Sequence, residues 1–209
     1  MSSPSTTLFY NVASPFARKV LILLHETGQF ERVTLLQTLP TPVSPDAVLI
    51  QENPTGKLPT LRLADGNVID DSRVILDYFD HQHAGNPLIP RDGSARWRRL
   101  TLASLADAVL DAALLIRYET FLRPPEKHWD LWLDNQAEKI QRTLAYFEQD
   151  AVAELSSQFD IASIGVAAAL GYLDFRQPDL NWRSSYPRLA NWYADVSKRP
   201  SMLSTQPSV

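Results

Sequence analysis

The feature that most constrains the fold is a change of pattern near the middle of the chain. Through residue 83, short β-favouring runs alternate with helical periodicity, whereas beyond residue 92 only helical periodicity remains. Residues 84–92 lie between the two patterns and contain Gly85, Pro87 and Pro90, a composition typical of domain linkers. We therefore expect an α/β domain at 1–83, a linker at 84–92 and an all-helical domain at 93–209.

The start of the first domain predicts a βαβ unit. Thr7–Asn11 and Glu31–Leu36 are β-favouring runs, and an apolar periodic stretch lies between them. Ser14 has the chemistry of an N-cap, Pro15 suits the first helical position, and Gly28 is suited to ending the helix. The two strands are expected to be parallel.

The rest of this domain predicts ββα. The runs Leu58–Leu63 and Asn67–Ile69 flank an Asp-Gly turn that ends at Gly66, which indicates an antiparallel hairpin. Asp71-Ser72 then begins a helix with an apolar face. The proline-rich residues 37–56 are expected to form a loop with one helical turn after Ser44-Pro45, and this loop is a candidate lid over a site.

The second half predicts a bundle of helices. Apolar residues recur at helical spacing in four stretches, which are Arg96–Tyr118, Glu126–Phe147, Asp160–Leu173 and Pro187–Lys198.

Composition excludes several classes of function. The formal net charge is −4, so the chain lacks the basic field that nucleic acids or anionic membranes attract. There is no Cys, which removes a protein thiol nucleophile and thiolate metal sites. His81 and His83 are two residues apart, so they point to different faces of a helix and no metal site is expected. Met1 to Thr7 does not resemble a secretion signal, and no apolar run spans a bilayer, so we expect a cytoplasmic protein.

Pro59 is unusual because it lies in an apolar run that otherwise predicts a strand. Proline has no N–H for the ladder, so the run must bend or expose an edge there. A cis Leu58–Pro59 bond would do both and turn the backbone of Leu58 toward an extended peptide, although spacing alone leaves cis and trans equally open. The helix starts at Ser14 and Asp71 both attract anions. A ligand with a thiolate and a carboxylate could address both.

Three segments together resemble the cytosolic glutathione transferases, and the resemblance covers nearly the whole chain. Each is weak alone, but their order and spacing are specific: Ser14-Pro15-Phe16-Ala17-Arg18-Lys19-Val20, Asn53-Pro54-Thr55-Gly56-Lys57-Leu58-Pro59-Thr60-Leu61 and Asp70-Asp71-Ser72-Arg73-Val74-Ile75. The resemblance implies a thioredoxin-like domain followed by an all-helical domain. It also implies that the Leu58–Pro59 bond is cis.

The resemblance further implies roles for individual residues. Ser14 matches the hydroxyl that hydrogen-bonds the glutathione sulfur in the serine-type classes. Leu58 matches the residue whose main chain pairs with the cysteinyl part of the tripeptide. Asp71 and Ser72 match the acid–serine pair that holds the γ-glutamyl end. Glutathione is thus the implied co-substrate, and no metal is implied.

Alternative interpretations of these residues remain open. Lys57 lies beside the implied site and is assigned to the glycyl carboxylate, or it is a solvated surface charge. Tyr10 is a second hydroxyl near the end of the first strand and an alternative candidate for the contact with the thiol, because other classes of the family use Tyr there. Its other possible roles are core packing and a contact at the rim of the site. Ser14 and Asp71 also suit plain helix caps.

Elementary energetics support a role for one hydroxyl. A thiol with a pKa near 8.5 is only slightly ionised at neutral pH, and the thiolate is the nucleophile. Lowering that pKa by about 2 needs roughly 2.7 kcal/mol of preferential stabilisation of the thiolate. A hydrogen bond to a charged acceptor contributes about 1.5–3 kcal/mol and a helix dipole up to about 2 kcal/mol, so Ser14 at a helix start is sufficient.

The leading functional hypothesis is a glutathione transferase that joins the glutathione thiolate to a small, largely apolar electrophile, with a role in detoxification. The acceptor is expected near Val12 and Phe16 and the first long helix, where Arg117 and Tyr118 are candidate contacts. The alternative is a non-catalytic or weakly active glutathione-binding or regulatory protein of the same fold. The resemblance implies a homodimer. A Ser14 hydrolase is disfavoured because no nucleophile elbow or nearby His accompanies it.

Overall fold

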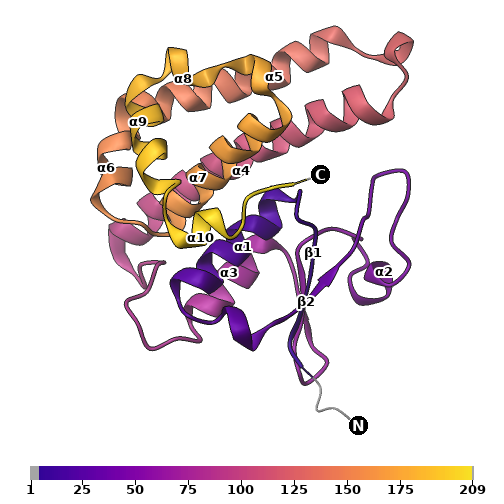
Figure 1. Cartoon of the computed structure of the whole chain (residues 1–209), viewed down its shortest axis with the longest axis vertical. Coiled ribbons are helices and arrows are strands. Elements are labelled where there is room, and N and C mark those ends of the chain that lie inside the picture. Colours follow the sequence, from indigo (N-terminus) through magenta and orange to yellow (C-terminus); the bar gives the residue numbers. More distant parts are fainter. Residues whose placement is uncertain (1–4, 209) are drawn as a thin grey trace. The chain divides into compact units, whose positions relative to one another are not determined.

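The computed structural model describes residues 5–208 and divides them into two compact units (Figure 1). The first unit comprises the residues through Pro87 together with those from Pro200 onward, and the second is Leu88–Arg199. The expected order of an α/β unit and a helical unit is confirmed, but the boundaries differ from those expected at both ends of the second unit.

The first unit is built on a four-stranded mixed sheet. Its strands are β1 (Thr7–Tyr10), β2 (Thr34–Gln37), β3 (Thr60–Arg62) and β4 (Val68–Ile69), in the order β2-β1-β3-β4. β1 pairs with β2 in parallel and with β3 in antiparallel, and β4 is antiparallel to β3. This confirms the predicted parallel βαβ unit followed by a hairpin.

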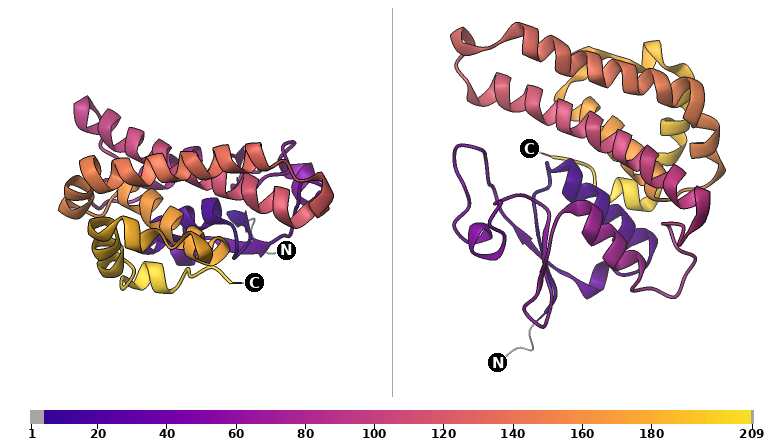
Figure 2. Two further views of the ribbon diagram at one scale, coloured as in Figure 1. Left: turned by 90° about the horizontal axis from the view of Figure 1, so that it is seen from above. Right: turned by 180° about the vertical axis from the view of Figure 1, so that it is seen from behind.

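Two helices cover one face of this sheet. They are α1 (Pro15–Glu26) and α3 (Ser72–Asp80), which pack against each other, while α2 (Leu49–Glu52) lies on the other face (Figures 1 and 2). A 3₁₀ turn at Phe30–Arg32 precedes β2. The buried core of this unit includes Phe9, Leu23 and Ile75, all with no exposed surface. Gly28, at a φ of 66°, follows the end of α1, as the sequence predicts.

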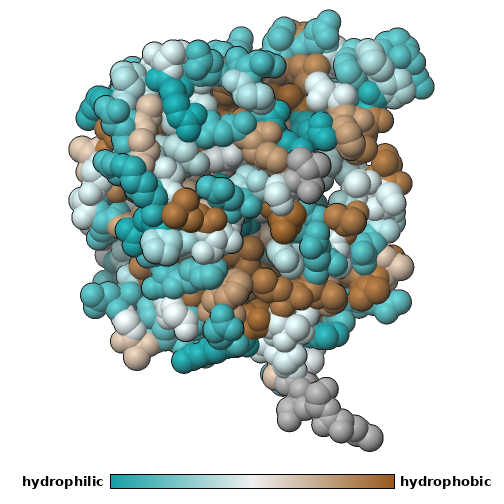
Figure 3. Space-filling model, in the orientation of Figure 1, coloured by the Kyte–Doolittle hydropathy of each residue, from teal (hydrophilic) through white to brown (hydrophobic). Residues whose placement is uncertain are grey.

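The segment between β2 and β3 is irregular except for the single turn α2. The Asp46 carboxylate accepts hydrogen bonds from the amides of Val48 and Leu49, so the helical turn begins a few residues after Ser44-Pro45. The segment exposes Leu39 and Val43, and hydrophobic residues reach the surface in the lower part of Figure 3 among hydrophilic ones. That this segment acts as a lid stays a prediction.

The end of the chain belongs to the first unit rather than to the predicted domain 93–209. After α10 (Pro200–Leu203) the chain meets α1, where buried Arg18 donates hydrogen bonds to the Met202 carbonyl at 3.2 Å and the Thr205 hydroxyl at 3.5 Å. The Ser201 hydroxyl also donates to Glu26. A buried guanidinium needs such acceptors, and nothing in the local pattern of the last ten residues indicates that they supply them.

The predicted linker 84–92 is also only partly a linker. Ile89 is 1% exposed, and the Leu88 carbonyl accepts a hydrogen bond from the amide of Ile161 at 3.1 Å. The helical unit therefore begins at Leu88 and not at residue 93.

The second unit consists of helices, as predicted. The bounds of its longer elements are α4 (Gly93–Leu122), α5 (Asp130–Tyr146), α6 (Val152–Ser157), α7 (Ile161–Arg176) and α9 (Pro187–Val196). Shorter turns are the 3₁₀ segments Pro125–Lys127 and Pro178–Leu180, the π-helical Phe147–Ala151 and α8 (Trp182–Ser185). Predicted helix Glu126–Phe147 starts later because its first residues form the 3₁₀ turn.

Helix α7 is the centre of this unit. Every residue from Ile161 to Leu173 is buried, as expected for a helix that is apolar on all sides. It packs on α4, where a Cβ added to Gly165 would come within 3.3 Å of the Ala106 side chain. The small residues thus let the two helices approach closely.

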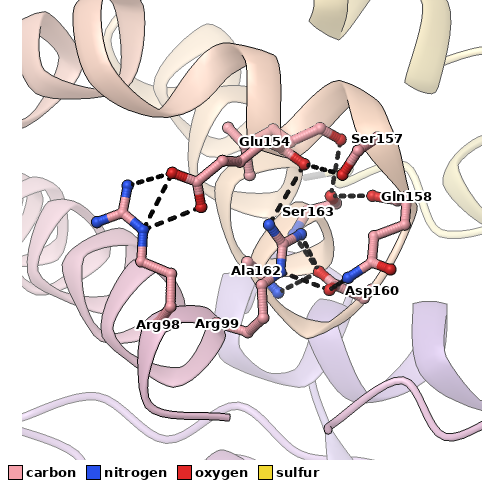
Figure 4. Close-up of polar contacts among 9 residues, drawn as sticks. Arg98, Arg99, Glu154, Ser157, Gln158, Asp160, Ala162 and Ser163 are labelled. Atoms are coloured by element: carbon pink, nitrogen blue, oxygen red, sulfur yellow. Dashed lines mark hydrogen bonds and ion pairs between the residues drawn. The ribbon is translucent and has the colours of Figure 1, made fainter. Parts of the chain in front are cut away.

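A buried ion pair holds the start of α7 (Figure 4). The Asp160 carboxylate accepts hydrogen bonds from the amides of Ala162 and Ser163 and from the guanidinium of Arg99 on α4, and Gln158 donates to it as well. Arg99 and Asp160 are 5% and 4% exposed. Because each charge is matched and hydrogen-bonded, the pair locks α4 to the beginning of α7.

Candidate functional site

The register of the sheet brings three of the motifs to one edge of the first unit. Phe9 pairs with Thr60 in the antiparallel β1–β3 ladder, so the residues after β1 meet those before β3. Ile69 pairs with Leu61 in the antiparallel β3–β4 ladder, so the residues after β4 reach the same edge. Ser14, Leu58-Pro59 and Asp71-Ser72 therefore gather at this edge, which we call the ligand edge.

Ser14 forms the N-cap of α1. Its backbone is extended, with φ −79° and ψ 115°, and its hydroxyl oxygen accepts a hydrogen bond from the Ala17 amide at 3.2 Å. The turn before it is shaped by Asn11, whose carbonyl accepts from the Ser14 amide at 2.9 Å and whose side chain accepts from Ala13 at 2.8 Å. Within residues 5–208 the Ser14 hydroxyl donates no hydrogen bond. Its proton is therefore available to a bound acceptor.

Leu58 presents an unpaired backbone at the ligand edge. The Leu58–Pro59 bond is cis, as the family resemblance implies. Among the residues that the structure describes, no hydrogen bond engages the N–H or the carbonyl of Leu58. Leu58 is half-buried and Pro59 is buried, so packing holds the unpaired backbone groups of Leu58 in place. An extended peptide can pair with them as an added strand.

Asn53 organises the loop that carries Lys57, and the sequence analysis did not single it out. Asn53 is 1% exposed, and its amide nitrogen donates to the Thr60 hydroxyl at 2.8 Å and to the Lys57 carbonyl at 3.4 Å. Its amide oxygen accepts from the backbone and hydroxyl of Thr55. The Asn-Pro pair at the start of the motif is a turn signal that pointed to this role. The Lys57 side chain itself is exposed, so its glycyl contact stays a prediction.

Asp71 and Ser72 begin α3. The Asp71 carboxylate accepts a hydrogen bond from the Arg73 amide at 2.9 Å and pairs with the Arg73 guanidinium at 2.8 Å. Hydrogen bonding from the Arg73 side chain, aided by the charge of Lys19, lowers the pKa of Asp71 below its ordinary value of 3.8. Ser72 is 3% exposed, and its hydroxyl forms no hydrogen bond with another residue in the described range. The edge thus offers a carboxylate and a hydroxyl side by side.

Lys19 is a second residue that the sequence analysis did not assign to the site. It is 2% exposed although charged, its ammonium lies 5.2 Å from the centre of the Phe16 ring, and it acts electrostatically on Asp71. Lys19 lies on α1, five residues after Ser14. A buried cation there favours an anionic group at the start of α3.

The predicted acceptor residues divide between the two units. Val12 and Phe16 are half-buried beside Ser14, and so is Tyr10 at the end of β1. Arg117 and Tyr118 lie near the end of α4 in the helical unit, both half-buried. That these residues contact one acceptor stays a prediction.

Neither a metal site nor a membrane span is found in the described part of the chain. No three His, Cys, Asp or Glu side chains within residues 5–208 are grouped so that they could hold a metal ion. None of the helices in that range is long and apolar enough to cross a bilayer.

Comparison with known proteins identifies the family. The glutathione S-transferase N-terminal domain profile matches residues 13–82, and the C-terminal domain profile of glutathione S-transferases matches residues 130–195. An uncharacterized GST-like protein of Escherichia coli strain K12, YibF, is 33% identical over 197 residues, which are 93% of this chain and 95% of that protein.

Two crystal structures show the likeness in three dimensions. A glutathione transferase family member from Pseudomonas fluorescens Pf-5 with bound glutathione is 65% identical, with a TM-score of 0.97 over 98% of this chain and 100% of that chain. A second structure from that organism, with bound S-(propanoic acid)-glutathione, is 62% identical, with a TM-score of 0.93 over 98% and 100% of the two chains. The chain therefore belongs to the glutathione S-transferase family.

Proposed function

We propose that this protein binds glutathione at the ligand edge and transfers its sulfur to a small electrophile. The observation that carries the proposal is the gathering of Ser14, Leu58 and Asp71 at one edge of the sheet. The relative with bound glutathione, at 65% identity over 98% of this chain, supports the same ligand here.

Different residues of the ligand edge are proposed to bind the γ-glutamyl, cysteinyl and glycyl parts of glutathione. Asp71 is ionised at neutral pH and accepts from the γ-glutamyl ammonium, while the hydroxyl and the amide of Ser72 donate to the α-carboxylate. The free backbone of Leu58 pairs with the cysteinyl unit. Lys57 is the proposed partner of the glycyl carboxylate.

The reactive step depends on Ser14. Its hydroxyl donates a hydrogen bond to the glutathione sulfur at the positive end of α1. This hydrogen bond and the helix dipole stabilise the thiolate relative to the thiol. The bound electrophile is then attacked within one complex rather than by collision. Val12 and Phe16 are proposed as its apolar contacts on this unit. We also propose a homodimer, a cytoplasmic location and a role in detoxification, as the family resemblance implies.

The test combines calorimetry with conjugation assays over a panel of electrophiles. Ser14→Ala is expected to lower turnover by about 10-fold to 100-fold, the equivalent of one charge-assisted hydrogen bond, while glutathione affinity changes little. Ser14→Thr keeps the hydroxyl and serves as the matched control. Glutathione binding without turnover on any acceptor would favour the non-catalytic, regulatory alternative. Absence of glutathione binding would refute the proposed function.

A further inference from the structure

Asn11 closes the short turn that leads from β1 into α1. Residues 11–14 connect the end of β1 to the start of α1. The Asn11 carbonyl accepts a hydrogen bond from the Ser14 amide at 2.9 Å, and its side-chain oxygen accepts one from the Ala13 amide at 2.8 Å. Asparagine favours such turns because its short side chain can bond the backbone two residues ahead. The two bonds together fix the backbone that carries the Ser14 hydroxyl.

The nitrogen end of the same side chain is tied to the segment after β2. It donates a hydrogen bond to the Thr38 carbonyl at 3.0 Å, and the Thr38 amide donates to the carbonyl of Tyr10 at 2.9 Å. Thr38 is 6% exposed, so Asn11 is attached to a buried part of this unit. The two contacts of the Asn11 side chain need one acceptor and one donor. An amide supplies both, whereas a carboxylate supplies acceptors alone.

The Ser14 hydroxyl depends on this turn for its orientation. The bond that it accepts from the Ala17 amide, at 3.2 Å, is at the long end of the hydrogen-bond range, and the two turn bonds, at 2.8 and 2.9 Å, are shorter. The turn is therefore the tighter constraint on the backbone of Ser14. Orientation matters because a hydrogen bond weakens steeply when the angle at its proton departs from linear. A loosened turn would keep the hydroxyl but change the direction of its O–H.

We propose that Asn11 is a positioning residue for the transfer step and holds the Ser14 hydroxyl in the orientation that donates to the sulfur of bound glutathione. This inference rests on the proposed function, because the sulfur is the acceptor of that hydrogen bond. The Asn11 side chain engages the backbone at Ala13 and Thr38, so it acts through Ser14 and not on glutathione itself. The sequence analysis assigned no role to Asn11.

The expected effect of losing Asn11 is a partial loss of thiolate stabilisation. Asn11→Ala removes both side-chain contacts but leaves the Ser14 hydroxyl and the start of α1 in place. We therefore expect the pKa of the bound glutathione thiol to rise by about 1, which is half of the lowering expected in the wild type. Turnover at pH 7 should fall about threefold, because a smaller fraction of the thiol is ionised.

The test is a titration of the bound thiol, followed by the ultraviolet absorbance of the thiolate, in the wild type and in three variants. Asn11→Ala should show the raised pKa, and Asn11→Ser should restore part of the lowering, because a serine hydroxyl can also accept from the Ala13 amide. Asp65→Ala is the matched control. Asp65 lies in the turn between β3 and β4, at the opposite edge of the sheet, and accepts from the amide of Asn67 at 2.9 Å. This control should keep the wild-type pKa, and an equal rise in it would overturn the inference.

A double-mutant cycle separates the positioning of Ser14 from a general structural role. If Asn11 acts through the Ser14 hydroxyl, Asn11→Ala should raise the thiol pKa by about 1 in the wild-type background and by less than about 0.3 in the Ser14→Ala background. A plain structural role would shift the pKa by the same amount in both backgrounds. Equal shifts would therefore show that Asn11 does not position Ser14, and the inference would be wrong.

Glutathione affinity distinguishes failure of this inference from failure of the proposed function. At pH 6 the bound thiol should be mostly protonated, so calorimetry should give each variant an affinity within about twofold of the wild type, which also shows that the variant is folded. A much weaker affinity of Asn11→Ala at this pH would show that Asn11 supports the whole site, and would overturn the inference. If glutathione binds with a lowered thiol pKa that Asn11→Ala leaves unchanged, this inference is wrong and the proposed function stands. If the wild-type chain binds no glutathione, the proposed function itself fails and the inference fails with it.

Discussion

Asp71 and Asp160 begin two helices in the same way and differ in what surrounds them. Both accept hydrogen bonds from amides of the first turn, of α3 and α7 respectively. Asp160 is 4% exposed and paired with buried Arg99, whereas half of the Asp71 side chain is exposed and its partner Arg73 is more exposed still. One capping pattern therefore supports two roles. A buried carboxylate with every oxygen engaged holds helices together, and an open one can receive a ligand.

The largest expected effect is on stability at the buried cap. Asp160→Ala removes the cap and leaves Arg99 charged and unmatched in the interior, so we expect the free energy of unfolding to fall by about 3–5 kcal/mol. Urea denaturation measures it. Asp71→Ala, at the exposed cap, should cost only about 0.5–1 kcal/mol. Equal losses in the two variants would contradict the comparison.

The second expected effect is on glutathione affinity, for which the exposed cap Asp71 matters more than the buried cap Asp160. Asp71→Ala should weaken glutathione binding by about 1.5–3 kcal/mol, because a charge-assisted contact with the γ-glutamyl ammonium is lost. Calorimetry measures this loss. Asp65→Ala is the matched control, since Asp65 is also exposed and accepts from an amide two residues ahead, that of Asn67, at 2.9 Å. A similar loss of affinity in the control variant would argue against a specific contact at Asp71.

The smallest effect concerns pH. The pKa of Asp71 is lower in the folded chain than its ordinary value, so its ionised form adds stability above that value and the contribution disappears as the pH falls through the folded pKa. Between pH 7 and pH 5 the difference in unfolding free energy between wild type and Asp71→Asn should stay constant. Below about pH 4 the difference should shrink, by less than about 1 kcal/mol because the pair is exposed. A difference that grows on acidification would show that the sign is wrong.

Local chemistry explains why the first unit could be predicted well. Ser14, Gly28 and the Asp-Gly turn mark boundaries through backbone preferences that act within a few residues. The gathering of the motifs at the ligand edge follows from strand order and direction, which short strands and turns make predictable.

Long-range partners explain what could not be predicted. The last residues join the first unit because Arg18 needs acceptors that lie more than 180 positions away in sequence. Arg98 and Arg99 stand in a run of basic residues near the start of α4, yet their partners Glu154 and Asp160 lie more than 50 positions further along the chain. The homodimer itself stays a proposal.

The most direct test of the account is a titration of the thiol of bound glutathione, followed by the ultraviolet absorbance of the thiolate. In the wild-type chain we expect a pKa about 2 below that of the free thiol, because the Ser14 hydroxyl and the start of α1 stabilise the anion. In Ser14→Ala the pKa should return most of the way toward the free value, and Ser14→Thr should preserve the lowered one. An unshifted pKa in the wild type, or the same lowered pKa in Ser14→Ala, would contradict the account.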